Sequence, residues 1–320
     1  MRTSNPLSFI PFFDMAVEAN RFLRGSANLE IHGVGEKTED DPAFHKTVIT
    51  IENKEGAEAL KRPVGSYITI ESKDVSEEKN ESRFVSAIAE SIGEMLPEND
   101  DAPVLVCGIG NPRIIADSLG SSVLSMLLAT RSASAMPVGH GGRAGAVRPV
   151  ALLTPDVFGN TGIESAEMIR AVAGIVKPEA ILIIDALATT SVSRLGRSVQ
   201  ITDTGITPGG GIGNHRPEIG KALFHVPVIA IGVPTVIYPQ AIIGDFFSRL
   251  ETKDEKTASL IGEAVSNYLS DMSGDAMADF AVTPKDIDAT VAAAARRIAG
   301  GIEIALHEEI NAANYRSYLR

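Results

Sequence analysis

Two aspartates that follow apolar runs are the side chains best placed for acid–base chemistry. Asp185 comes directly after Ile181–Ile184, and Asp117 follows the run Val104–Cys107 and a Gly-Ile-Gly-Asn turn. In an open α/β sheet, ligands bind in the crevice at the carboxyl ends of the strands. Two carboxylates delivered to that crevice could act as a general acid and a general base, or as ligands of a hard metal ion.

A structural role explains the two aspartates unequally well. Burying the charge of Asp185 at the end of an apolar strand costs several kcal/mol unless the carboxylate is paired or used, which favours a functional role. Asp117 precedes Ser-Leu-Gly and can simply cap the helix that follows. The pattern alone therefore leaves both roles open for Asp117.

Other short motifs point to chemistry less specifically. Asp203 begins an Asp-Thr-Gly triplet, but the pepsin-type fold needs two such triplets, so we expect at most a third carboxylate in the crevice. The turn Gly108–Gly110 lacks the third glycine of a dinucleotide fingerprint, and Pro208–Asn214 lacks the Gly-Lys-Ser/Thr ending of a phosphate loop. Both can be tight turns or walls of an active site. The six histidines show no metal-binding spacing, and there is no Gly-x-Ser-x-Gly elbow.

Composition narrows the class of protein. The 320 residues are 44% hydrophobic and 22% charged, as in soluble globular proteins, and the net charge of −12 argues against direct nucleic-acid binding. The single cysteine, Cys107, lies in an apolar run, so we expect a buried hydrophobe in a reducing cytosol. The sequence contains neither an apolar run of about 18 residues nor a recognisable signal peptide. We expect a cytoplasmic protein with no membrane partner.

The elements that must position these residues follow from the apolar runs. Short Val/Ile/Leu runs separated by helices predict a mostly parallel sheet between helix layers. Thr283 as N-cap and Pro284 at the first position should open the last helix, and 28–42 should be polar and irregular. The expected strands are 46–52, 66–71, 104–107, 149–153, 180–184, 199–202 and 226–233; the expected helices are 14–23, 84–95, 118–129, 165–176, 254–269 and 284–307; and 132–146 should be a loop.

Longer motifs resemble the germination protease (spore protease) family. The likeness extends from about Asp14 to His307 and includes many ordered segments, so coincidence does not explain it. The segments that carry it are Gly65–Glu71, Cys107–Asn111, Thr154–Ser165, Ile184–Ala188, Ile201–Asn214, Val226–Val236, Phe280–Asp288 and Gly301–His307.

The resemblance implies an endopeptidase that degrades small acid-soluble spore proteins during germination, in the spore core. It implies an α/β fold similar to hydrogenase-maturation endopeptidases, a three-layer sandwich with a mostly parallel central sheet and a small N-terminal β-rich region. A zymogen, a homotetramer and the absence of cofactor and metal are also implied. The family's essential aspartates match Asp117 and Asp185, which would activate water and protonate the leaving amine. We expect the wall of the active site to contain Gly108, Gly110, Asn111, Thr161, Gly162, Glu164, Gly209, Gly213 and Asn214.

The resemblance also suggests a processing site. The segment Phe13–Glu18 matches the acidic–apolar–Ala–x–Glu pattern cut in the family's substrates, so we expect self-cleavage between Asp14 and Met15. Residues 1–14 would be a propeptide and 15–320 a single catalytic domain, with a β-rich part over 15–101 and the main α/β part over 102–320. Alternatively, Asp14 only caps a helix.

Departures from the family pattern keep other functions open. Pro112–Ala116 stands where the family tends to have Trp-Asn-Val-Thr-Pro, and Ser132 and Asp156 replace a usual His and Gly. Substrate preference can therefore differ. One alternative is a metal-assisted peptidase that uses Asp117, Asp185 and Asp203 as ligands. Another is a catalytically degenerate binding or scaffold protein.

Overall fold

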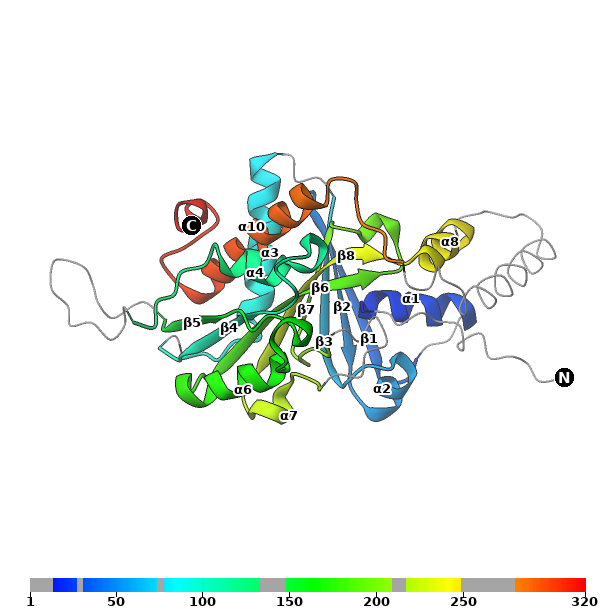
Figure 1. Cartoon of the computed structure of the whole chain (residues 1–320). Coiled ribbons are helices and arrows are strands. Elements are labelled where there is room, and N and C mark those ends of the chain that lie inside the picture. Colours follow the sequence, from blue (N-terminus) through cyan, green and yellow to red (C-terminus); the bar gives the residue numbers. More distant parts are fainter. Residues whose placement is uncertain are drawn as a thin grey trace, which may run out of the picture.

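Eight strands form one sheet in the order β1-β2-β3-β7-β8-β6-β4-β5 (Figure 1). The structure is a computed structural model that describes residues 14–27, 31–73, 77–99, 101–132, 148–208, 217–248 and 280–320. The strands are β1 (Val34–Asp40), β2 (Phe44–Ile51), β3 (Gly65–Ser72), β4 (Val104–Gly108), β5 (Val150–Leu153), β6 (Ala180–Thr189), β7 (Ser198–Thr202) and β8 (Val228–Ile237). The helices are α1 (Ala16–Ala27), α2 (Lys54–Leu60), α3 (Glu78–Gly93), α4 (Leu119–Leu124), α5 (Phe158–Thr161), α6 (Ser165–Val176), α7 (Lys221–Phe224), α8 (Pro239–Ser248) and α10 (Ile287–Leu306), with short 3₁₀ turns η2 (Ile115–Asp117), η3 (Val192–Arg194) and η6 (Tyr315–Ser317).

The sheet is mixed, which corrects the expectation of a mostly parallel one. Strands β5, β4, β6 and β8 pair in parallel. Strand β7 runs antiparallel to β8, and β3, β2 and β1 continue the sheet in antiparallel fashion. An apolar run shows that a strand is buried but not its direction, so the sequence could not reveal that β7 is reversed.

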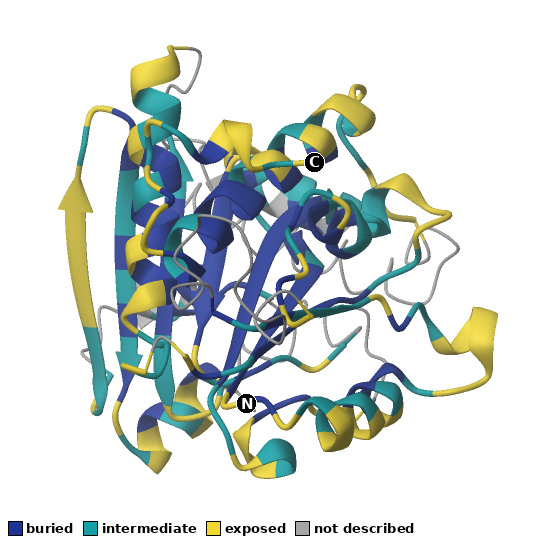
Figure 2. Ribbon diagram, turned by 90° about the vertical axis from the view of Figure 1, so that its left-hand side faces the viewer, coloured by how far each residue is buried: buried dark blue, intermediate teal, exposed yellow. Residues whose placement is uncertain are grey.

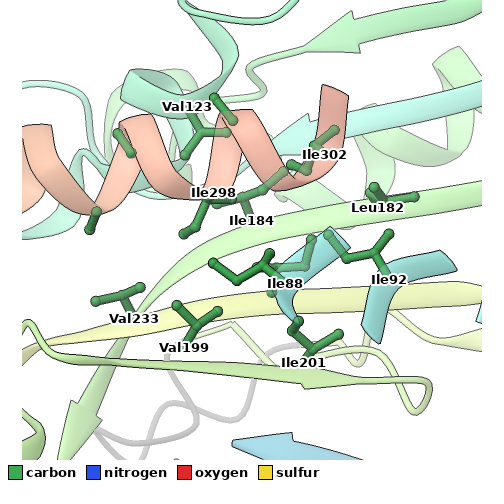
Figure 3. Close-up of a cluster of buried hydrophobic side chains, with 14 of the residues drawn as sticks. Ile88, Ile92, Val123, Leu182, Ile184, Val199, Ile201, Val233, Ile298 and Ile302 are labelled. Carbon is green, nitrogen blue, oxygen red and sulfur yellow. The ribbon is translucent and has the colours of Figure 1, made fainter. Parts of the chain in front are cut away.

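One face of the sheet packs against α3, α4 and α10. Side chains alternate along each strand, so every second residue of β6 and β8 joins this cluster. Figure 3 shows how Ile298 and Ile302 of α10 and Ile88 and Ile92 of α3 meet these strands. Other strand residues drawn there are Leu182, Ile184, Val199, Ile201 and Val233. A tightly packed core here fixes the backbone from which Asp185 projects.

The opposite face packs against α1, α2, α6 and α7 (Figure 1). The intervening residues of β4 and β6, among them Cys107 and Ile183, lie under α6, while α1 and α2 cover β2 and β3. Cys107 is fully buried and unpaired, as expected, and burial raises the pKa of its thiol. Figure 2 shows that buried residues concentrate in the central strands, whereas one edge strand, β1, is largely exposed.

Most expected elements are present, with differences at their ends. Helix α6 has the expected bounds, but α4 ends at Leu124, and the N-cap of α10 is Asp286 rather than Thr283. Strand β1 and helix α2 form where no element was expected. The expected helix 254–269 and most of the loop 132–146 lie outside the described residues. Within the described ranges, no helix has both the length and the hydrophobicity needed to cross a membrane.

Candidate active site

Asp185 lies inside β6 rather than at its end. The strand continues to Thr189, so it extends past the end of β4, where Gly108 pairs with Ile184. Only 7% of Asp185 is exposed, and its Oδ1 accepts a hydrogen bond from the Ala186 amide at 2.8 Å. Because Ile183 belongs to the cluster under α6 and side chains alternate, the Asp185 carboxylate points to the face covered by α1 and α6.

Asp117 ends the short turn η2 and is half-buried. Its Oδ2 accepts a hydrogen bond from the backbone amide of Asn111 at 2.7 Å, so the carboxylate turns back to the loop that follows β4. The N-cap of α4 is Ser118, which makes no side-chain capping bond. The interaction with Asn111 therefore gives Asp117 a position at the carboxyl end of β4.

The glycines between β4 and η2 allow the chain to approach itself closely. Gly110 has φ +102°, and a Cβ there would lie 2.2 Å from the Asp117 carbonyl oxygen and 2.9 Å from its Oδ1. A Cβ on Gly108 would lie 2.3 Å from the Gly120 carbonyl oxygen in α4. Glycine is needed at both positions for steric reasons, and at Gly110 also for its backbone conformation. This explains the Gly-Ile-Gly turn without a bound nucleotide.

Backbone contacts bring the two aspartates to the same edge of the sheet. The Ile109 amide donates to the Ile184 carbonyl at 2.9 Å, which continues the β4–β6 pairing up to Asp185. Turn η2 contacts both β6 and β8, and Thr235 Oγ1 of β8 donates to the Ala116 carbonyl at 2.6 Å. The carboxyl edge of the parallel strands thus presents two acidic side chains that can exchange protons with a bound ligand.

The loop after β5 borders this edge. Thr161 and Gly162 form the end of α5, where Gly162 adopts φ +71°, and Glu164 caps α6 in a reciprocal capping box with Glu167. Their observed contacts are therefore local and structural. The loop is tied to the site through Asn160, whose Nδ2 donates to Asn111 Oδ1 at 3.2 Å.

Asp203 lies away from the other two aspartates. It follows β7, whose reversed direction carries its carboxyl end toward the amino ends of β6 and β8. Since Gln200 is in register with Gly232 and Gly232 with Asp185, Asp203 lies about 10 Å further along the sheet. Its Oδ1 accepts a hydrogen bond from the Ser66 amide at 2.8 Å. The structure therefore does not bring Asp203 to the site.

Three expected wall residues, Gly209, Gly213 and Asn214, lie outside the described residues. Among the residues that the structure does describe, no three His, Cys, Asp or Glu side chains are grouped so that they could hold a metal ion. The three-aspartate ligand set of the metal-assisted alternative is not assembled, because Asp203 is directed elsewhere.

The segment Asp14–Glu18 binds across the extended end of β6 and across β7. The Ala188 amide donates to Asp14 Oδ2 at 2.8 Å, and Gln200 Nε2 donates to the Asp14 carbonyl at 2.9 Å. The Ala16 amide donates back to Gln200 Oε1 at 2.8 Å. Met15, Ala16 and Val17 are fully buried. The Asp14–Met15 bond is therefore held on the sheet face to which Asp185 points.

Two side chains that bind this segment were not singled out from the sequence. Gln200 is a polar residue in the buried strand Ser198–Thr202, and Arg194 is a 5% exposed arginine in η3. Buried polar groups need partners, and that requirement was the only available signal. Burial raises the pKa of Asp14, while the Ala188 hydrogen bond and Arg62 act in the opposite direction and Glu18 adds to the rise.

Known proteins are similar to this chain over most of its length. A family model described as germination protease matches residues 13–253. The chain is 32% identical to a germination protease of Clostridium tetani, over 96% of this chain and 98% of the relative. It is 34% identical to one of Clostridium perfringens, over 93% and 97%, and 36% identical to one of Caldanaerobacter subterraneus, over 92% and 93%. The chain therefore belongs to the germination protease family.

Proposed function

We propose that this chain is an endopeptidase that starts the degradation of small acid-soluble spore proteins during germination, with Asp117 and Asp185 as its catalytic groups. Family membership supports peptide hydrolysis in spore germination. The observation that carries the assignment to this edge of the sheet is the docking of the Asp14–Met15 bond on the face to which Asp185 points.

Two carboxylates suffice for the chemistry. One, ionised, accepts a proton from water as the water oxygen attacks the carbonyl carbon of the scissile bond. The other, protonated, donates its proton to the leaving nitrogen as the carbon–nitrogen bond breaks. Water is consumed, and a carboxylic acid and an amine are formed. The two groups have different surroundings: Asp185 is 7% exposed within the sheet, and Asp117 is half-buried on a turn.

The same site would process the chain itself. Cleavage between Asp14 and Met15 would release residues 1–14 as a propeptide and leave 15–320 as the catalytic domain. Met15 is fully buried, and the Asp14 side chain is bound to β6, which supports a zymogen whose own segment occupies the site. Assembly as a homotetramer in the spore core, without a cofactor, belongs to the same proposal.

The finer features of the fold are also part of this proposal. Helices on both faces of the sheet support a three-layer sandwich similar to hydrogenase-maturation endopeptidases. The antiparallel strands β1, β2 and β3 correspond to the β-rich part over residues 15–101.

Intact-mass measurement tests the proposal directly. The purified full chain, incubated at mildly acidic pH, should lose residues 1–14 and should then cleave a peptide that contains Glu-Ile-Ala. The Asp185→Asn variant should do neither. A cut at another bond would overturn the processing site, and a wild-type chain that leaves the peptide intact would favour the degenerate scaffold. Loss of cleavage in chelator, restored by a divalent ion, would favour the metal-assisted alternative.

A further inference from the structure

The side chain of Gln200 grips the peptide on both sides of the Asp14–Met15 bond. Its Nε2 donates to the Asp14 carbonyl, which belongs to that bond, and its Oε1 accepts from the Ala16 amide. A carbonyl oxygen only accepts and an amide only donates, so these two partners fix which way the carboxamide faces. A single side chain thus sets the position of three consecutive residues.

Gln200 also shares a sheet face with Asp185. Gln200 is in register with Gly232 on β8, and Gly232 is in register with Asp185 on β6. Residues in register on neighbouring strands point the same way, so both side chains rise from one face with a glycine between them, about 10 Å apart at the backbone. A peptide bond that contacts Gln200 therefore lies over the same surface as the carboxylate of Asp185.

A second pocket holds a carboxylate four residues after Asp14. Glu18 is 4% exposed, and its Oε1 accepts from Thr189 Oγ1 and lies 3.4 Å from Arg194 Nη1. Its Oε2 accepts from the Thr190 amide at 2.9 Å. Arg194 is itself held by Glu71, whose Oε1 accepts from Arg194 Nε at 2.8 Å. A buried carboxylate with a cation and two further donors is strongly favoured over a neutral side chain there.

We propose that Gln200 positions the bond that this protease cuts and that Arg194 determines its preference for an acidic side chain downstream. Gln200 binds the carbonyl of the bond to be cut, and Arg194 binds an acidic side chain four residues downstream. This inference rests on the proposed function, because it takes Asp14–Met15 to be the bond that is hydrolysed. In the unprocessed chain Asp14–Glu18 makes these contacts. Residues 15–18 stay in the processed chain, so a substrate peptide displaces them to make the same contacts.

The binding of the carbonyl by Gln200 has a catalytic consequence. As water attacks, negative charge develops on the carbonyl oxygen, and a donor already aimed at that oxygen stabilises the charge. The structure places Gln200 Nε2 at 2.9 Å from this oxygen. Removal of the donor should therefore lower the rate of cleavage more than it lowers the affinity for the peptide.

The Gln200→Glu variant tests the first half of the proposal. It keeps an oxygen for the Ala16 amide and loses the N–H donor, so self-cleavage and peptide kcat should fall by about 10²-fold, with a smaller change in KM. The deficit relative to wild type should shrink as the pH falls, because the introduced carboxyl becomes a donor when it is protonated. Thr202→Ser, on the same face of β7, is the matched control and should retain wild-type rates and melting temperature.

The second half is tested with a pair of peptides, Glu-Ile-Ala-x-Glu and the same peptide with Gln at the last position. The processed wild-type protein should cleave the Glu peptide about tenfold or more better in kcat/KM, as charge-assisted pairs allow. Arg194→Gln should cleave both peptides equally. Because the comparison is made within each protein, a loss of stability in the variant does not mimic the result.

The outcomes separate this inference from the proposed function. If Asp185→Asn is inactive while Gln200→Glu and Arg194→Gln behave as wild type, the specificity proposal is overturned alone. If Asp185→Asn cleaves normally but Gln200→Glu does not, the two-aspartate chemistry fails and the role of Gln200 stands. A wild-type chain that is never cut between Asp14 and Met15 overturns both.

Discussion

The two ends of the central sheet both bury acidic groups, but they do so differently. At the carboxyl end, Asp14 and Glu18 have hydrogen-bond donors from β6, the residues after it and η3. At the amino end of β5, Glu303 of α10 and His307, the C-cap of that helix, are buried, with Arg148 near His307, and Glu303 Oε2 and His307 Nδ1 have no hydrogen-bond partner. The first arrangement fixes a peptide in place, whereas the second tolerates unpaired polar atoms.

Perturbed pKa values alone would have pointed to the amino end of the sheet instead of the proposed site. Burial raises the pKa of Glu303 to about 7 and lowers that of His307 to about 4. Glu303 Oε2 lies 3.4 Å from His307 Nε2, but both shifts favour the neutral forms, so we regard the pair as uncharged near pH 5–6. Buried structural groups shift in this way as catalytic groups do, so contacts with a peptide are the better guide.

The largest expected effect is on the rate of peptide cleavage, which should fall for substitutions at the carboxyl end of the sheet and not for one at the amino end. Asp117→Asn and Asp185→Asn should each lower peptide cleavage by about 10²- to 10⁴-fold, since each removes one proton-transfer step. The double variant should be little worse than either single one, because the two groups act as a unit. Glu303→Gln, at the amino end, should keep wild-type kcat. A large loss of kcat in Glu303→Gln would contradict the comparison.

A second prediction concerns the turn that holds Asp117. Gly110→Ala should destabilise the fold by about 1–3 kcal/mol, because its φ is +102° and the new Cβ would collide with Asp117. The displaced Asp117 carboxylate should also lower activity in molecules that remain folded. Gly174→Ala, in an exposed turn of α6 with nothing within 4 Å, is the control and should be stabilising by about 0.5–1 kcal/mol in chemical denaturation. Equal stability of the two variants would refute the steric argument.

Glu303 and His307, at the amino end, should make the free energy of unfolding depend on pH. Glu303 has a raised folded pKa, so its contribution is complete below its ordinary value of 4.5 and is lost as the pH rises through about 7. His307 has a lowered folded pKa, so its contribution is complete above its ordinary value of 6.5 and is lost as the pH falls through about 4. The two trends oppose each other between pH 4.5 and 6.5.

Single substitutions should separate these trends. Glu303→Gln should leave a free energy of unfolding that rises with pH from about 4 to 6.5, and His307→Gln one that falls from about 4.5 to 7. Each change should amount to about 1–3 kcal/mol in urea titrations at several pH values. Flat profiles for both variants would show that these groups titrate alike in the folded and unfolded states.

The smallest expected effect is at the carboxyl end, in the docking of Asp14. Its folded pKa is raised, so docking is favoured below its ordinary value of 3.8 and weakens as the pH rises through the folded pKa. In an Asp185→Asn background, the protection factors of the Met15–Glu18 amides, which are corrected for the intrinsic exchange rate at each pH, should be larger at mildly acidic than at neutral pH. Asp14→Asn should remove that difference, while Arg62 and Glu18, the charged groups that act on Asp14, stay in place.

The sequence predicted those elements of the fold that a local pattern of apolar residues marks, and it missed others. Apolar runs located β4, β6 and β8, and the prediction for 165–176 gave the bounds of α6. Strand β1 was missed because Val34–Asp40 is polar and exposed, so it has no apolar alternation. The continuation of β6 through Asp185 was missed because the prediction ended the strand at the first charged residue.

The positions of the candidate site residues were also predicted only in part, because a local pattern shows neither the direction of a strand nor contacts with distant residues. Asp117 and Asp185 were chosen for their place after buried strands, and both lie at the carboxyl edge. Asp203 was chosen for its Asp-Thr-Gly triplet, and it lies elsewhere because β7 is reversed. No local pattern marks Gln200 or Arg194, whose importance comes from residues more than 170 positions away in the chain.

These long sequence separations determine when the Asp14 segment can dock during synthesis and folding. The partners of Asp14 lie 174 and 186 residues downstream, so its segment can dock only after β6 and β7 have been synthesised and paired. Contacts between such distant residues form late, because closure of the intervening chain must come first. The Asp14–Met15 bond thus reaches its place on the sheet only in a chain in which β6 and β7 have formed. On the proposed function, self-cleavage at this bond would report that folding is finished, and incomplete chains would stay uncut.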